Sequence, residues 1–456
     1  MAQRVVDDGA SGELWLPRPD FLPDPKDIRL TTVTQPNPYL KNGSDTVTLE
    51  AAYDFGLATL HAVSGYADVT IRDLDDCAGI LPNLAGCIRG TDPSRHHQFS
   101  QELRLASAGG TSVDWLIGAY YYDDRADSTF HQYTPVIDPQ PTIDRQSTVK
   151  ETTAAVFGQA TWHFAERWST TLGLRVNREK HFLSTIGTGT NDSPTLVSDD
   201  VVENNHSWLV DLQYAVSDDV LLYGSVSTGF KSGGFTIQDG GVLDGFAPEE
   251  LIAYEAGIKS EWLDERLRLN AAAFYYDFRD LQVSTFTLID NELVFETDNA
   301  ARAKIYGIDA ETTLNVTEHL GVSGGVVWLP KRKFTEYRND DTGDTLSGND
   351  LARAPERSAT AALDYRYSLP GGARFSARLE VNTRSGYFYT PDNNPAFSQD
   401  AFNLVNLFLR FEPASAKWYA FASGRNLTDA DYFNQVFIQA SPGYPDTYEA
   451  GFGVRF

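Results

Sequence analysis

The two cysteines of the chain, Cys77 and Cys87, could form a disulfide bond. They enclose a short segment, CAGILPNLAGC, whose Gly and Pro residues indicate a loop. Two cysteines this close, with none elsewhere, favour a disulfide formed in an oxidising compartment. The alternative is a pair of free thiols. A metal site is less favoured, because no histidine stands at ligand spacing near them.

Motifs for catalysis or metal binding are absent from the sequence. It contains no Ser/His/Asp order, no glycine-rich phosphate loop and no HExxH. His96 and His97 are adjacent, so on a strand they point to opposite faces and cannot hold one metal together. The acidic segment 336–350 lacks the ligand spacing of a calcium loop. Carboxylates are plentiful, but nothing selects a pair for glycoside hydrolysis. We therefore predict no enzyme, no cofactor and no metal site.

Aromatic and basic side chains beside predicted loops are the candidates for ligand contact. Rings and cations at a watery entrance suit iron chelates or sugars. The alternative is that they are ordinary loop residues and interfacial aromatics. The candidate contacts are Phe230, Lys231, Phe235, Tyr276 and Arg279.

The last eleven residues, DTYEAGFGVRF (446–456), are predicted to form a strand that crosses a bilayer. Tilted strands need about 9–11 residues to do so. Every second residue is apolar or small, whereas the residues between are Arg, Gly, Gly and Glu. Such alternation gives one face that suits lipid and one that suits water. The alternative is an edge strand of a soluble sandwich. The lipid-compatible positions are Tyr448, Ala450, Phe452, Val454 and Phe456.

Similar alternation recurs along the chain. In 374–384, Phe, Ala, Leu, Val and Thr share one face, and the other carries Arg, Ser, Glu and Asn. Segments 208–214, 254–262 and 405–411 repeat the pattern, and Trp or Tyr often stands at the ends of the apolar face. Charges of both signs on the polar face suit a water-filled lumen, while aromatic ends suit the two membrane interfaces.

The predicted connections are short at one end of the strands and mostly longer at the other end. Eight short turns imply sixteen strands, and the terminal strand brings the count to about seventeen. This layout predicts an all-β, antiparallel, up-and-down transmembrane β-barrel over residues 45–456, preceded by an irregular loop segment, 1–44. The short turns are predicted at 54–56, 108–111, 165–167, 217–219, 263–265, 317–318, 370–372 and 413–416. The longer loops are predicted at 73–94, 123–149, 183–204, 231–248, 330–350 and 387–399.

Composition is compatible with one large barrel. The 456 residues include 12% aromatics, and the mean hydropathy of −0.33 excludes a protein that spans membranes with helices. A net charge of −26 makes nucleic-acid binding an unsuitable function. The start, MAQRVVDDGA, lacks the basic and apolar regions of a signal peptide.

Four segments resemble TonB-dependent outer-membrane receptors when taken in this order. They are LLYGSVSTGFKSGGF (221–235), 248–283, 299–320 and GRNLTDADYFNQ (424–435), followed by the terminal GFGVRF. The resemblance implies a bacterial outer-membrane location and contact with outer-membrane lipid. It also implies uptake of a scarce nutrient such as a ferric siderophore. In that family the barrel has 22 strands and holds a plug, through which the TonB complex supplies energy.

The sequence departs from that family at its start. It shows no signal peptide, no TonB-box segment and no plug, and about five strands fewer. An odd strand number fits a barrel cut open. We therefore expect an incomplete receptor that does not transport by itself and contacts the TonB complex only through a missing plug. The terminal aromatics Tyr448, Phe452 and Phe456 resemble the signal that the barrel assembly machinery reads. The alternatives are a passive porin-like channel, or a soluble β-rich binding protein or hydrolase.

Overall fold

The computed structural model describes most of the chain. Its described residues are 2–7, 16–17, 39–76, 88–134, 138–188, 195–237, 243–289, 292–338, 345–436 and 439–455. Within these ranges the structure is nearly all β, with one short 3₁₀ helix, η4 (Pro395–Phe397). None of the helical structure in these ranges is long and apolar enough to span a bilayer.

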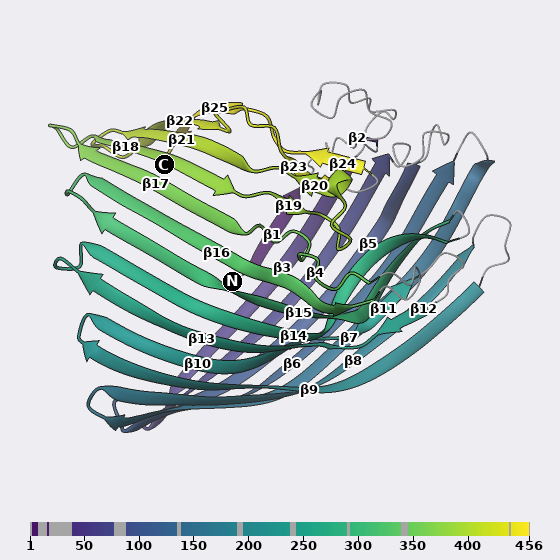
Figure 1. Cartoon of the computed structure of the whole chain (residues 1–456), viewed down its shortest axis with the longest axis horizontal. Coiled ribbons are helices and arrows are strands. Elements are labelled where there is room, and N and C mark those ends of the chain that lie inside the picture. The colour runs from purple at the N-terminus through teal and green to yellow at the C-terminus, as the bar shows by residue number, and fades with distance from the viewer. Residues whose placement is uncertain are drawn as a thin grey trace.

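One large antiparallel sheet of 18 strands dominates the structure (Figure 1). Its first half comprises β1 (Ala2–Asp7), β3 (Tyr39–Asp54), β4 (Ala58–Asp76), β5 (Ile88–Ser107), β6 (Val113–Thr134), β7 (Asp138–Ala165), β8 (Trp168–Thr188), β9 (Thr195–Ser217) and β10 (Val220–Lys231). Its second half comprises β13 (Glu249–Trp262), β14 (Leu267–Ile289), β15 (Glu292–Asn315), β16 (Leu320–Tyr337), β17 (Arg357–Ser368), β18 (Arg374–Arg384), β21 (Phe402–Glu412), β22 (Trp418–Arg425) and β25 (Thr447–Val454).

The strand registers form one series from β1 to β25, each strand pairing with the next along the chain. Figure 1 shows this sheet curling over, so that strands of its two halves overlap in the view. Among the described residues, β1 has a register only with β3, and β25 only with β22. Within the described residues, each of these two end strands therefore has one edge without a partner strand.

All eight predicted short turns are confirmed. Each connects consecutive strands of the large sheet, and the turns gather at one end of it (Figure 1). Several contain residues at positive φ, which tight hairpins require and glycine adopts without steric cost. Examples are Gly56 at φ 85° and Gly371 at φ 97°. We call this end of the sheet the short-turn end and the opposite end the loop end.

At the loop end, strands continue far into segments predicted as loops. Most of 123–149 belongs to the hairpin of β6 and β7, whose register extends to Thr134 and Asp138. Most of 183–204 likewise lies in β8 and β9. These loop predictions were wrong because the extensions carry polar residues on both faces, so no alternation marks them as strands.

The strand count and the N-terminal segment also differ from expectation. Among the described residues the sheet has 18 strands, one more than the predicted count of about seventeen. The additional strand is β1, which pairs with β3 inside the segment expected to be irregular. Strand β3 itself begins at Tyr39, before the predicted boundary at residue 45.

The two faces of the sheet have opposite character. Leu172 and Val210 are opposite each other on β8 and β9 and are 55% and 44% exposed, so they mark an apolar outer face. On the inner face, the guanidinium of Arg378 bonds the carboxylate of Asp364 at 2.6 Å. Exposed apolar side chains outside and paired charges inside are the arrangement of a membrane barrel.

Small sheets surround the loop end. They are β11 (Gly234–Ile237) with β12 (Leu243–Phe246), β19 (Tyr387–Phe388) with β20 (Ser398–Gln399), and β2 (Leu16–Pro17) with β24 (Gln439–Pro442) and β23 (Phe433–Val436). A buried cluster of Tyr389, Phe397 and Val436 joins the β19–β20 hairpin to β23. This packing gives the loop end a core of its own.

Candidate functional site

The outer face of β8 changes from apolar to charged at Arg178. Leu172, Leu174 and Val176 precede it on that face and are exposed. Lys180 follows, and its ammonium lies 2.9 Å from the carboxylate of Asp200 on β9. Charges on a lipid-facing surface are costly, so the part of β8 beyond Val176 lies outside the membrane-spanning band.

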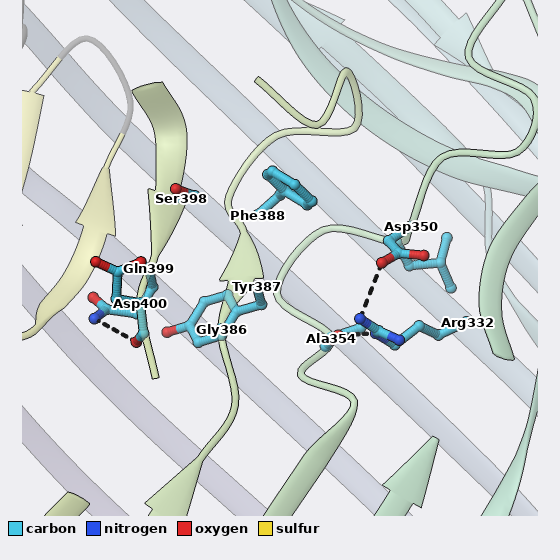
Figure 2. A pocket seen from close by; sticks show the side chains of 10 residues that line it. Arg332, Asp350, Ala354, Gly386, Tyr387, Phe388, Ser398, Gln399 and Asp400 are labelled. Carbon is cyan, nitrogen blue, oxygen red and sulfur yellow. Dashed lines mark hydrogen bonds and ion pairs between the residues drawn. The ribbon is translucent and has the colours of Figure 1, made fainter. Parts of the chain in front are cut away.

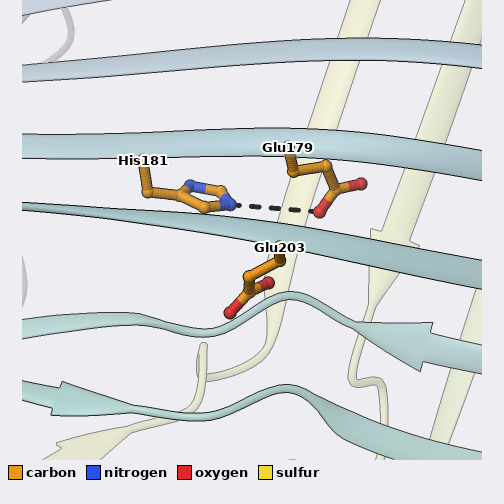
Figure 3. A group of neighbouring side chains, drawn as sticks. All are labelled: Glu179, His181 and Glu203. Atoms are coloured by element: carbon orange, nitrogen blue, oxygen red, sulfur yellow. Dashed lines mark ion pairs between the residues drawn. The ribbon is translucent and has the colours of Figure 1, made fainter.

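Just beyond this boundary, the inner face carries a cluster of Glu179, His181 and Glu203 (Figure 3). Glu179 and His181 are two residues apart on β8, so they share a face. Glu203 of β9 is directly opposite Glu179 in the register. One potential ligand atom from each residue lies within 4.8 Å of the others. The strand register therefore brings together two carboxylates and an imidazole.

The surroundings of the cluster fix both carboxylates. The Ser232 hydroxyl donates to Oε2 of Glu179, and the Gly233 N–H donates to Oε2 of Glu203 at 3.2 Å. Both donors belong to the segment that follows β10, which thus covers the cluster. Glu179 and Glu203 are only 7% and 8% exposed.

The electrostatics of the cluster centre on His181. Its Nδ1 lies 3.8 Å from Oε1 of Glu151 on β7, and its Nε2 lies 3.9 Å from Oε2 of Glu179. The Glu151 and Glu179 carboxylates raise the pKa of His181 to about 9. In return, the nearby imidazole lowers the pKa of both carboxyl groups. His181 is therefore protonated at neutral pH and offsets part of the negative charge of the cluster.

A second feature is a pocket of about 240 Å³ between the end of β16 and the β19–β20 hairpin. Figure 2 shows the Arg332 guanidinium bonded to Asp350, with Tyr387 and Phe388 on the neighbouring segment. The Nη2 atom of Arg332 is 3.0 Å from Oδ2 of Asp350, and its side chain is 11% exposed. Because Asp350 already neutralises the Arg332 cation, the pocket offers rings, hydrogen-bonding groups and the carboxylate of Asp400.

The structure divides the predicted ligand contacts between the two faces. Phe230 of β10 and Arg279 of β14 both lie opposite Glu250 of β13. Alternation along the strands places them on the outer face, which also carries Leu222 and Tyr254. Lys231 and Tyr276 occupy the alternate positions of the same two strands, so their side chains face inward. The Tyr276 ring stacks on that of Phe274, with centroids 4.7 Å apart. Phe235 lies on β11 of a separate small sheet, so the five residues do not form one site.

The sequence prediction about His96 and His97 agrees with the geometry. They are consecutive residues of β5, and only the His97 ring approaches Asp68, with Nδ1 3.1 Å from Oδ2. The Glu179–His181–Glu203 cluster was missed. Its Glu-x-His spacing on a strand is visible in the sequence, but Glu203 is placed by a register that the sequence does not reveal.

Two of the three terminal aromatics lie on the outer face of the sheet. Tyr448 and Phe452 of β25 are 72% and 65% exposed on the outer face. The Phe452 ring lies 5.4 Å from that of Trp418. Phe456 is outside the described residues. The role of these residues in assembly stays a prediction.

Cys77 and Cys87 also lie outside the described residues. The last described register pair of β4 and β5 is Asp76 with Ile88, and the cysteines are the next residue on each side.

We therefore expect a disulfide between Cys77 and Cys87 in the oxidised protein. Its small ring is expected to stabilise this hairpin by roughly 2–3 kcal/mol in the chain-entropy description. Thiol labelling of the unreduced, denatured protein should modify no cysteine, while prior reduction should expose two sites. Labelling of both thiols without reduction would show the prediction to be wrong.

Comparisons with known proteins agree with this architecture. Residues 3–427 match the family model "TonB dependent receptor-like, beta-barrel". The pesticin receptor of Yersinia pestis is 25% identical over 374 residues, which cover 78% of this chain and 50% of that protein. The metal-pseudopaline receptor CntO of Pseudomonas aeruginosa is 25% identical over 62% of this chain and 38% of its own length. The chain spans about half the length of the pesticin receptor.

Solved structures show the same fold. The ferric yersiniabactin uptake receptor FyuA from Yersinia pestis superposes with a TM-score of 0.79 at 20% identity, covering 92% of this chain and 62% of that one. The siderophore receptor PiuA from Acinetobacter baumannii gives a TM-score of 0.71 at 16% identity, covering 90% and 64%.

Proposed function

Because the chain belongs to the family of TonB-dependent receptor-like β-barrels, we propose that it forms the barrel of an outer-membrane receptor that takes up a ferric siderophore or a similar metal chelate. The observation that carries this proposal is the family match over 3–427, together with similar proteins named as a metal-pseudopaline receptor and a siderophore receptor. The family is one of outer-membrane proteins, so outer-membrane lipid is the expected surrounding of the apolar face.

The arrangement of the sheet supports specific partners. In the proposed orientation the short turns face the periplasm and the loop end faces the exterior, as in outer-membrane barrels generally. The ligand would enter at the loop end, where inward Tyr276 and Lys231 and the ring of Phe235 are the proposed contacts. The TonB complex would supply energy through a plug inside the barrel. We also propose that the segment predicted as one barrel domain, 45–456, is extended at its start to include all of β3 (Tyr39–Asp54).

We expect cells that produce the protein from its own gene to accumulate ⁵⁵Fe from a siderophore they use, and cells lacking the gene to lose this uptake. The uptake should stop when TonB is deleted or a protonophore is added. Replacing the inward Tyr276 by Ala is expected to weaken siderophore binding on the order of 10-fold, because about 1–1.5 kcal/mol of ring contact is lost.

Tyr275→Ala is the matched control, since Tyr275 is adjacent but shares the outer face with Tyr254 and Tyr306. It should leave binding unchanged. Uptake that persists without TonB would contradict the proposal and indicate a passive channel. Equal losses in the two tyrosine variants would contradict the proposed contact.

A further inference from the structure

The inner-wall cluster of Glu179, His181 and Glu203 has a composition that suits a metal ion. Glu179 and Glu203 face each other directly across β8 and β9, and like charges in that position are unfavourable. Both carboxylates are more than nine-tenths buried, so water does little to screen them. The protonated His181 offsets part of this charge, and a bound divalent cation would offset it more fully.

The hydrogen bonds around the cluster leave coordinating atoms available. Ser232, Gly233 and Asn205 each donate a hydrogen bond to an Oε2 atom of the two carboxylates. The Nε2 atom of His181 is buried and has no hydrogen-bond partner. Its distance of 3.9 Å to Glu179 is too long for a hydrogen bond. A buried imidazole nitrogen near two carboxylates, with an ion pair but no hydrogen bond, is unusual for a purely structural network.

We propose that Glu179, His181 and Glu203 bind a divalent first-row transition-metal ion such as Zn²⁺ on the inner wall of the barrel. Imidazole nitrogen and carboxylate oxygen are suitable ligands for these ions. With bonds of about 2.0–2.2 Å, two ligand atoms of one Zn²⁺ stand roughly 3.4 Å apart. The present separations of up to 4.8 Å therefore need to shorten by about an ångström or more, which side-chain rotation supplies.

The bound ion would also act on the segment that follows β10. Ser232 and Gly233 hold the same carboxylates that would hold the metal, so they orient the ligands from outside. Binding would displace the imidazole proton and fix this segment against β8 and β9. This inference does not depend on the uptake proposal, because it concerns the ion alone and not a chelate in transit.

The test is a calorimetric titration with Zn²⁺ of the detergent-purified protein, from which a chelator has first removed bound metal. We expect one saturable site per chain. Glu203→Gln keeps an amide oxygen for the Gly233 N–H but weakens metal binding, and His181→Ala removes the imidazole. Each should lower the affinity at least about 10–100-fold, the loss that follows removal even of a partner that orients a ligand. The visible spectrum of the Co²⁺-loaded protein should show nitrogen and oxygen ligation that both variants lose.

His97→Ala is the matched control, because it removes a histidine that pairs with a single carboxylate, Asp68, on other strands. It should bind Zn²⁺ as the unmodified protein does. Heat-modifiable mobility on electrophoresis checks folding, and His181→Ala decides the matter if Glu203→Gln does not fold. The proposal is overturned if the unmodified protein binds no Zn²⁺, or if both variants bind it as tightly as the control.

Discussion

Deletion of Phe456 is expected to remove most of the assembled barrel from the outer membrane. The terminal strand β25 (Thr447–Val454) pairs with β22 and, within the described residues, with no other strand. Its outer face carries Tyr448 and Phe452, both largely exposed, and Phe456 continues the same alternation. A strand with one free edge depends on recognition and pairing at that edge, because unpaired backbone groups cost several kcal/mol each in hydrocarbon.

The measurement is the amount of heat-modifiable protein in outer-membrane fractions of cells that express the gene with and without the last codon. Glu449→Gln is the control, since Glu449 lies on the other face of the same strand and pairs with Ser423. It should assemble normally. Unchanged levels after deletion of Phe456 would contradict an assembly role for the terminal aromatic.

The sequence predicted those parts of the fold that depend on local chemistry. All eight short turns were found, because Gly, Asp, Pro or Ser marks most of these hairpins and clear alternation marks membrane-crossing segments such as β18 (Arg374–Arg384). The polar extensions of β6 and β7 were missed, because strands that stand in water on both faces have no such alternation. Strand β1 was missed because AQRVVD is short and has a partner, β3, more than thirty residues away.

The candidate site was less predictable because it depends on register. A shift of one residue moves every side chain to the other face. Phe230 and Arg279 were selected by residue type, and the pairing of β10, β13 and β14 places them on the outer face. Glu203 meets Glu179 only through the register of β8 and β9. Sequence can suggest which residues carry chemistry, but the pairing of strands decides which of them meet.

An arginine placed on the outer face is expected to destabilise the barrel strongly, whereas its neighbour on the inner face should tolerate one. Ala361 and Thr360 are consecutive residues of β17 (Arg357–Ser368), so they lie at the same depth on opposite faces. Ala361 pairs with Gly324 and Val381 on the apolar face, between Trp328 and Tyr365, which mark its two ends. Thr360 faces inward and donates to Asn382 at 2.9 Å.

Ala361→Arg is expected to lower the free energy of unfolding by about 2–4 kcal/mol, the cost of a guanidinium near the midplane of a bilayer. Thr360→Arg should cost no more than its lost hydrogen bond, about 0.5–1.5 kcal/mol, because the new charge meets water in the lumen. Urea unfolding of the protein in lipid vesicles measures both values. If Thr360→Arg is the more damaging, or the two are equal, the assignment of the outer face to lipid is wrong. A larger loss of unfolding free energy in Ala361→Arg than in Thr360→Arg would show that the exposed apolar face of the sheet contacts lipid.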